Sequence, residues 1–181
     1  MKIEETALKD VLIITPAIFK DDRGWFAESY SADKLKTFGL GTVFVQDNHI
    51  YSEKSGVLRG IHFQNAPYAQ AKLLRCTRGK VVDYAVDLRR NSPTCRQWVC
   101  VQLSAENHKQ MFIPKGFGHA VVSLTEESEI QYKVDAPYNP SYDRAVRWDD
   151  PQLNIEWPFK TLILSEKDRS APFLKDSDCN F

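Results

Sequence analysis

The sequence contains no hydrophobic run long enough to span a bilayer, and its N-terminal residues 1–5 lack the apolar core of a signal peptide. We therefore expect no membrane partner. The chain also has no net charge, because 24 lysines and arginines balance 24 aspartates and glutamates. Bulk binding to nucleic acid needs an excess of positive charge, so the composition predicts no nucleic-acid partner and leaves room only for a local basic pocket.

The four cysteines form no CxxC pair and have no spacing typical of a metal site. Free thiols in a cytoplasmic protein are therefore the favoured interpretation of Cys76, Cys95, Cys100 and Cys179. The chain also lacks repeats, linkers and low-complexity segments. We predict a single domain over residues 1–181, a length that can bury a substantial core.

Short strand patterns dominate what the sequence does contain. Many such runs at close spacing predict a mainly β fold, either a sandwich or a small barrel such as a jelly roll. Ser31 is a suitable N-cap for a short helix over residues 32–37, which Gly39 ends, and the tail after Pro151 predicts further short helical turns. The strand runs are residues 11–15, 25–30, 43–50, 98–103, 111–113, 119–124 and 130–134.

Two hairpins are also expected. Residues 73–77 and 80–88 flank Arg78-Gly79, which is a typical hairpin turn. Residues 57–64 and 70–73 are expected to form the other hairpin.

The hairpin of residues 57–64 and 70–73 would hold Arg59, His62 and Lys72 on rigid strands. A cationic, partly dry pocket of this kind suits an anionic substrate that must also lose a proton. Histidine titrates near neutral pH, so His62 is a candidate general base, or else a core histidine with satisfied hydrogen bonds.

Simple alternation puts Arg59 and His62 on opposite faces of the strand, unless a bulge at Gly60 realigns them. Lys72 shares its parity with Leu74 and Cys76, which points it inward. A buried lysine without a role is rare, so its position favours a function.

A second motif, residues 114–119, reads Pro-Lys-Gly-Phe-Gly-His and is similar to the second box of cupins, P-x-G-x-x-H. In metal cupins this histidine is a ligand, together with an H-x-H pair and a glutamate from the first box. Here the first box would be His62-Phe63-Gln64, which lacks the second histidine and a suitably spaced glutamate. Three protein ligands are usual at a catalytic metal, so we expect none here and interpret His119 as a substrate contact or a structural histidine.

Tyr132 and Asp168 complete the candidates. Tyr132 shares its face with Ile130 and Val134 and is either a core tyrosine or a proton donor. Asp168 lies in the charged run 166–169, which by itself is typical of a solvated surface. Sequence alone does not bring it to His62.

Taken together, the chain resembles the dTDP-4-dehydrorhamnose 3,5-epimerases, the deoxysugar-epimerase branch of the cupins, over nearly its whole length. Each motif is weak by itself, but their order and spacing are highly specific. The motifs that carry the resemblance are residues 22–28, 46–48, 56–64, 70–73, 86–89, 92–94, 103–107, 113–117, 148–151 and 164–168.

The resemblance implies a cytoplasmic, metal-free jelly-roll homodimer that needs no cofactor and acts on a dTDP-linked 4-keto-6-deoxyhexose. His62 would be the general base and Asp168 its dyad partner. Tyr132 would return a proton to carbon 5 from the opposite ring face, and Lys72 would stabilise the enolate beside the 4-keto oxygen. The product would then pass to a reductase and end in rhamnose.

The resemblance also implies a set of substrate-binding residues, some of them supplied by the partner subunit. Arginines among them suit the diphosphate because their fork geometry fits its oxygens. Phe26 and Tyr138 are candidates for stacking on the thymine base. The binding positions are Arg23, Glu28, Gln46, Asp47, Asn48, Arg59, Lys72, His119, Asp143 and Lys167.

The chain departs from the family pattern at three places. Ala120-Val121 replaces the usual Gly-Phe, Asp143 replaces the more usual glutamate, and Val134-Asp135 replaces Cys-Thr or Thr-Thr. Two alternatives therefore stay open. One is a sibling enzyme that inverts only carbon 3 or only carbon 5 of a related keto sugar, and the other is a non-catalytic or metal-binding cupin.

Overall fold

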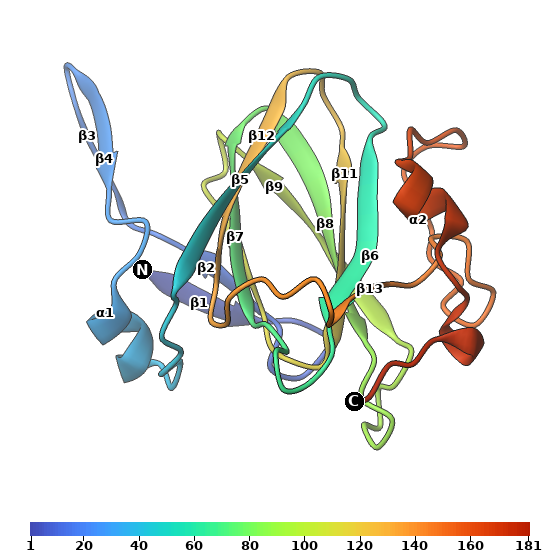
Figure 1. Ribbon diagram of the computed structural model, residues 1–181. Coiled ribbons are helices and arrows are strands. Elements are labelled where there is room, and N and C mark those ends of the chain that lie inside the picture. Colours follow the sequence, from blue (N-terminus) through green and yellow to red (C-terminus); the bar gives the residue numbers. More distant parts are fainter.

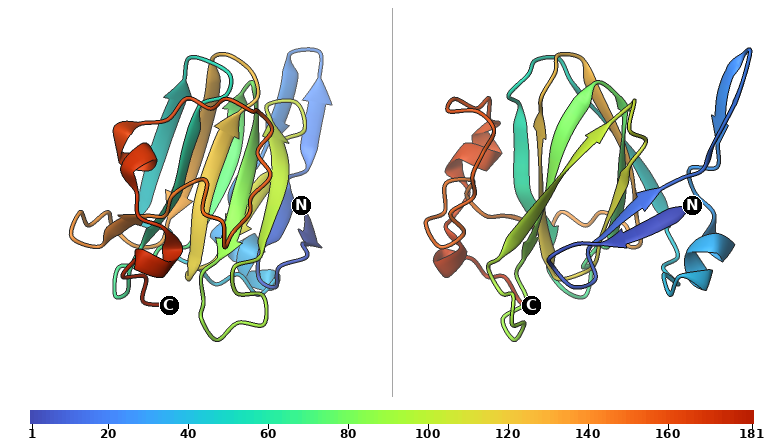
Figure 2. Two further views of the ribbon diagram at one scale, coloured as in Figure 1. Left: turned by 90° about the vertical axis from the view of Figure 1, so that its right-hand side faces the viewer. Right: turned by 180° about the vertical axis from the view of Figure 1, so that it is seen from behind.

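Two antiparallel sheets face each other in the computed structural model, which describes residues 1–181 (Figures 1 and 2). The six-stranded sheet has the order β1 (Lys2–Glu5), β2 (Leu12–Thr15), β10 (Gln110–Ile113), β7 (Lys72–Arg78), β12 (Ser128–Val134) and β5 (Gln46–Ser52). The five-stranded sheet has the order β13 (Asp143–Ala145), β6 (Leu58–Gln64), β11 (Phe117–Ser123), β8 (Lys80–Asp87) and β9 (Trp98–Ser104). The mainly β jelly-roll sandwich expected from the sequence is confirmed.

The main hydrophobic core fills the space between the two sheets. Alternation along each strand turns one set of side chains inward, among them Leu74, Val81, Leu103, Met111 and Val121, all of them buried. Full burial of such a side chain contributes about 1.5–3 kcal/mol, so these facing rows hold the sheets together.

Smaller clusters cover the outer face of each sheet. Helix α1 (Ala32–Thr37) packs Leu35 against Leu73 and Phe112 of the six-stranded sheet, and the Ser31 hydroxyl accepts a hydrogen bond from the Lys34 amide, as an N-cap should. On the other side the C-terminal segment covers the five-stranded sheet (Figure 1). Its Trp157 packs against Tyr84 of β8, with ring centroids 4.7 Å apart. This segment contains α2 (Glu166–Ser170) and η1 (Leu174–Asp176), in agreement with the short helical turns expected there.

Both expected hairpins are wrong. β7 pairs with β10 and β12, whereas β6 and β8 belong to the opposite sheet, where both pair with β11. The turn at Gly79 therefore carries the chain from one sheet to the other instead of reversing it within a sheet. A turn signal specifies a change of direction, and tertiary packing decides whether the next strand pairs with the last or crosses the sandwich.

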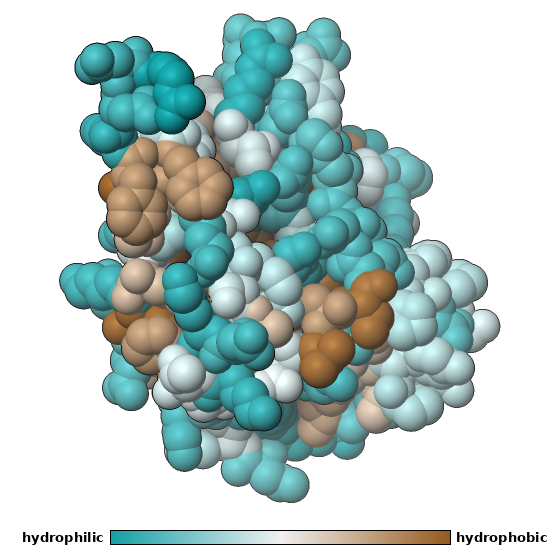
Figure 3. All heavy atoms as spheres, turned by 90° about the vertical axis from the view of Figure 1, so that its left-hand side faces the viewer, coloured by the Kyte–Doolittle hydropathy of each residue, from teal (hydrophilic) through white to brown (hydrophobic).

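The only local hairpin outside the two sheets is β3 (Ile18–Asp21) with β4 (Gly24–Ala27), and it projects from the body of the molecule (Figure 1). Figure 3 shows the side of the molecule that carries this hairpin, where hydrophobic side chains gather in several places between polar ones. Phe19, Phe26, Val43 and Val45 are each more than half exposed. No helix in the structure is long and apolar enough to cross a membrane.

Candidate active site

A cavity of about 510 Å³ lies at one end of the sandwich, between the inner faces of the two sheets. β6 and β11 supply one wall, β7 and β12 supply the other, and α2 with the chain before it closes the side. Eight of the predicted site residues line it: Arg59, His62, Lys72, His119, Tyr132, Asp143, Lys167 and Asp168.

A bulge in β6 brings Arg59 and His62 to the same wall. His62 is the register partner of His119 and Arg59 that of Val121, so three steps on β6 match two on β11. Gly60 lies in the extra step with φ +143°, and a Cβ there would be only 2.4 Å from the Ala120 Cβ. Only glycine fits this conformation and this close approach, which explains the glycine between the two candidate residues.

His62 and Asp168 form a hydrogen-bonded pair across 106 residues of sequence. The distance from His62 Nε2 to Asp168 Oδ1 is 2.5 Å, and Asp168 is buried on α2. Ser165 caps this helix, because its hydroxyl accepts a hydrogen bond from the Asp168 main-chain N–H at 3.1 Å and so fixes the main chain at Asp168. Burial opposes ionisation of Asp168, but the hydrogen bond from His62 and the charge of Lys167 outweigh it and lower the pKa of the carboxyl.

Tyr132 faces this pair from the opposite sheet. It points inward beside Ile130 and Val134 on β12, packs against the edge of the main core and reaches the cavity. Burial raises the pKa of its phenol, so the hydroxyl keeps its proton at neutral pH. The arrangement therefore sets a proton acceptor on one wall and a proton donor on the other.

Lys72 is buried at the end of β7 that reaches the cavity, in the inward row that continues with Leu74 and Cys76. Burial lowers the pKa of its ammonium group to about 8, while Asp83 and Asp143 oppose that shift and Lys167 reinforces it. At neutral pH the cavity thus contains a mostly charged, poorly solvated ammonium, a group suited to stabilise a developing oxyanion.

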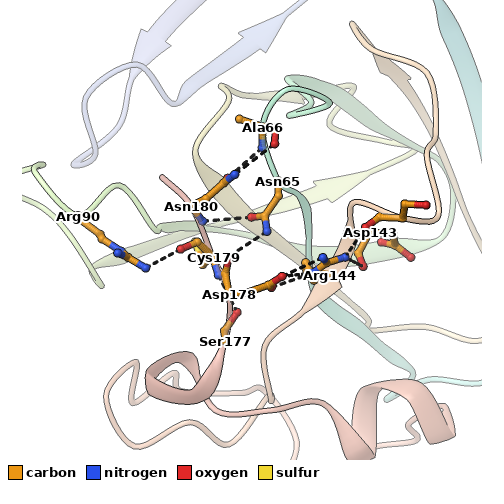
Figure 4. Close-up of polar contacts among 10 residues, drawn as sticks. Asn65, Ala66, Arg90, Asp143, Arg144, Ser177, Asp178, Cys179 and Asn180 are labelled. Atoms are coloured by element: carbon orange, nitrogen blue, oxygen red, sulfur yellow. Dashed lines mark hydrogen bonds and ion pairs between the residues drawn. The ribbon is translucent and has the colours of Figure 1, made fainter.

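Asp143 and Lys167 form an ion pair at the side of the cavity, with 2.5 Å between Asp143 Oδ2 and Lys167 Nζ. The same Oδ2 accepts a hydrogen bond from the Tyr138 hydroxyl at 3.3 Å, and Tyr138 also lines the cavity. The next residue on β13, Arg144, forms a forked ion pair with Asp178, which ties the C-terminal tail to this strand (Figure 4). The tail thereby holds β13, and with it Asp143, against the edge of β6.

Five predicted binding residues lie outside the cavity. Arg23 stands at the tip of the projecting hairpin, paired with Asp21, and Glu28 pairs with Lys34 near α1. On the edge strand β5 the side chain of Asp47 bonds Lys133 at 2.7 Å beside a second hollow. The remaining two, Gln46 and Asn48, bond each other at 2.9 Å, and Gln46 also accepts the Tyr138 amide.

The residue that sequence reasoning missed is Asp83 on β8. Its Oδ1 is 2.6 Å from His119 Nε2, and the two form a second His–Asp pair, in which His119 lines the cavity and Asp83 is buried beside it. The sequence contains one signal for this pair, a single aspartate inside the apolar run Val81-Val82-Asp83-Tyr84-Ala85. A charge in a buried strand needs a partner, so this aspartate predicts a buried polar contact.

His62 and His119, the two histidines of the cavity, each form a hydrogen bond between Nε2 and an aspartate carboxylate. No cluster of three or more His, Cys, Asp or Glu side chains in the structure could hold a metal ion. The expectation of a metal-free site stays a prediction, which a chelation experiment tests.

Comparisons with known proteins agree with one another. The family model for dTDP-4-dehydrorhamnose 3,5-epimerase matches residues 5–176. The enzyme of that name from Salmonella typhimurium is 49% identical, with 96% of each chain covered. The crystal structure of this epimerase from Bacillus anthracis, with TDP and PPi bound, has a TM-score of 0.93 at 45% identity and covers 95% of this chain and 98% of its own.

Two further solved structures bear on substrate and outcome. A dTDP-6-deoxy-D-glucose-3,5-epimerase from Legionella pneumophila, in complex with dTDP-4-keto-L-rhamnose, has a TM-score of 0.93 at 42% identity and covers 98% of this chain and 94% of its own. A 3′-monoepimerase from Streptomyces bikiniensis, in complex with dTDP-quinovose, has a TM-score of 0.87 at 32% identity, with 94% and 86% covered. By its family match and its full-length relatives, this chain belongs to the dTDP-4-dehydrorhamnose 3,5-epimerase family.

Proposed function

We propose that this protein is an isomerase that inverts carbons 3 and 5 of dTDP-4-dehydro-6-deoxyglucose to give dTDP-4-dehydrorhamnose. One observation carries the proposal beyond family membership. His62, which Asp168 of α2 bonds, and the Tyr132 phenol belong to opposite sheets and face the same cavity, and Lys72 lines that cavity from β7, the strand beside Tyr132. Inversion requires this division, since a proton removed from one ring face must be replaced from the other.

The reaction begins at the base. Because a carboxylate can only accept a hydrogen bond, the proton of neutral His62 resides on Nε2 toward Asp168, and Nδ1 is free to remove a proton from the sugar. Asp168 then stabilises the imidazolium that forms. The 4-keto group of the substrate acidifies the protons on both neighbouring carbons, so one base can serve each in turn.

The electrons left on carbon move into the keto group and form an enolate. Lys72 supplies a positive charge in a poorly solvated position, where electrostatic stabilisation is strong. Tyr132 then gives its phenolic proton to carbon 5 from the far face and recovers a proton from water. His62 releases the proton that it took to water before it serves carbon 3, and water supplies the proton that returns to carbon 3. The oxidation state of the sugar does not change overall, so the reaction needs no redox cofactor.

The nucleotide diphosphate would bind toward the mouth of the cavity. Arg59 and Lys167 line it and carry the positive charge that phosphate oxygens require. Asp143 bonds Lys167 directly, so Lys167 would exchange one anion for another when it binds a phosphate. Tyr138, more than half exposed beside Asp143, supplies a ring for the base.

The homodimer is part of this proposal. Arg23, Phe26 and Glu28 belong to or follow a hairpin that projects away from the body, and Phe26 is 67% exposed. In a dimer this hairpin would reach the partner's cavity, which explains why binding residues lie so far from His62 in their own chain. We place the active dimer in the cytoplasm, in keeping with four free cysteines, and treat residues 1–181 as one epimerase domain.

Similarity to a 3′-monoepimerase favours one alternative, inversion at a single carbon. Proton NMR of dTDP-4-dehydro-6-deoxyglucose with enzyme in heavy water separates the two outcomes. We expect deuterium and inverted configuration at both carbons, and inversion at only one would identify the sibling activity. Absence of exchange at both carbons would refute the proposed function.

A further inference from the structure

Asp83 is a buried acid that the proposed reaction does not use. It lies on the inner face of β8, in the row that contains the core residues Val81 and Ala85, and is 1% exposed. Its Oδ1 is 2.6 Å from His119 Nε2, whereas Oδ2 is the one buried side-chain oxygen or nitrogen in the structure without a hydrogen-bond partner. Burial of a carboxylate costs free energy that packing alone does not recover, so we expect Asp83 to have a function at this site.

Neighbouring strands connect this acid to the reacting groups. β8 and β6 flank β11, and His119 on β11 is the register partner of His62 on β6. His119 also lines the cavity with Lys72. Asp83 therefore lies in the same sheet as the base, on the strand next to His119.

We propose that Asp83 is a positioning residue of the epimerase, which holds His119 in its Nε2–H tautomer and supplies the negative charge behind Lys72. The inference rests on the proposed function, because it assigns Asp83 a part in the same reaction. Asp83 touches no substrate and acts only through His119 and Lys72.

The tautomer follows from the hydrogen bond. A carboxylate only accepts, so Nε2 must carry the proton toward Asp83. Burial lowers the pKa of His119, in spite of the opposing charge of Asp83, so the imidazole is neutral at pH 7. Its Nδ1 is then an acceptor that can bind a substrate hydroxyl but cannot donate to the 4-keto oxygen. Stabilisation of the enolate is thus left to the charge of Lys72.

The charges around Lys72 support the second part of the proposal, that Asp83 stabilises the Lys72 ammonium. Its charged surroundings are Asp83 on β8, Asp143 on β13 and Lys167 on α2, and the cavity also contains Arg59 and the ionisable His62, His119 and Tyr132. Asp143 is already bonded to Lys167 at 2.5 Å. The direct partner of Asp83 is a neutral imidazole, so the charge of Asp83 is the uncompensated one that favours the ammonium form of Lys72.

The test is Asp83→Asn, which keeps the shape, removes the charge and can donate to His119 Nε2. We expect at least a tenfold loss in kcat/KM at pH 7. We also expect the alkaline limb of the kcat/KM profile, where Lys72 loses its proton, to move down by about one pH unit. The control is Asp87→Asn on the same strand, a buried carboxylate held by Arg89, Ser92 and Thr94 outside the cavity. It should lower the melting temperature and leave the limb in place.

A spectroscopic measurement on the unaltered protein tests the proposal even where Asp83→Asn fails to fold. The chain has four histidines, so ¹⁵N-edited NMR can resolve His119 and read its tautomer. A proton on Nε2 with an unprotonated Nδ1 supports the proposal, and a proton on Nδ1 overturns it. An unshifted alkaline limb in folded Asp83→Asn also overturns it. Lack of epimerase activity in the unaltered protein would refute the proposed function instead, and the tautomer would still test the bond between Asp83 and His119.

Discussion

Removal of one hydroxyl, in Tyr132→Phe, tests the division of labour between the two sheets. The ring of Tyr132 packs beside the core residue Ile130, and phenylalanine keeps that packing. The hydroxyl has no hydrogen-bond partner in the structure, and burial is the main cause of its raised pKa. Its loss therefore leaves no buried hydrogen-bond donor or acceptor unpaired, and the free energy of unfolding should change by less than about 1 kcal/mol.

The effect on catalysis should be much larger and confined to one step. Positioned general acids contribute about 10²–10⁴-fold, so inversion at carbon 5 should slow by that factor, which is about 3–5 kcal/mol of barrier. Proton removal by His62 should continue, because the His62–Asp168 pair lies on the other wall. In heavy water the deuteron would then return from His62 to the same face, so carbon 5 should exchange without inverting.

The assay follows carbons 3 and 5 separately by proton NMR in heavy water, and far-UV circular dichroism serves as the control for folding. Normal inversion at carbon 5 in Tyr132→Phe would show that Tyr132 is only a core tyrosine. Equal loss of exchange at both carbons would indicate a damaged cavity. Either result would refute the assignment of the acid to β12.

Four further predictions follow from the site. His62→Asn should lower turnover by about 10²–10⁴-fold at unchanged nucleotide affinity, and a loss smaller than about tenfold would mean that another group removes the proton. Activity should survive exhaustive chelation with EDTA, and loss restored by a divalent ion would instead make His62 a metal ligand. The value of kcat/KM should fall as the pH rises through the Lys72 pKa of about 8, because the ammonium is the active form; a profile without this alkaline limb up to pH 10 would contradict the role of Lys72. Gly60→Ala should lower the free energy of unfolding by at least about 2 kcal/mol, because its Cβ would lie 2.4 Å from the Ala120 Cβ at φ +143°; Gly41→Ala, which has nothing within 4 Å of its Cβ, is the matched control in thermal melts.

Local chemistry explains which parts of the fold were predictable. The helix over residues 32–37 has its expected bounds because Ser31 and Gly39 specify its ends within a few residues. The inward direction of Lys72 and Tyr132 followed from strand parity alone. β4 ends at Ala27, short of the expected 25–30, and β5 begins at Gln46, later than the expected 43, because strand ends depend on where a partner strand stops.

The features that could not be predicted from local sequence patterns are contacts between residues far apart in the chain. His62 and Asp168 are separated by 106 residues, and no local pattern brings them together, so resemblance to a family was the sole guide. The partners of β6 and β7 were wrong for the same reason, because a connection between two strands does not reveal whether it crosses the sandwich. Arg23 and Glu28 raise a further difficulty, since they lie outside the cavity of their own chain and only the proposed dimer would bring them to a site.

The strand rows that build the core also build the site, and this explains how the sandwich can support stereochemical inversion. On β7 the inward row runs from Lys72 in the cavity to Leu74 in the core, and on β12 Tyr132 lies between Ile130 and Val134. The proposed acid and base therefore take their separation from the packing of two sheets, which is stiffer than any loop. An epimerase gains from that stiffness, because a donor that drifted to the wrong face of the ring would return the proton with retention. Among the four proposed catalytic residues, only Asp168 comes from a helix outside the sheets, and its proposed role is to orient His62 and not to contact the ring.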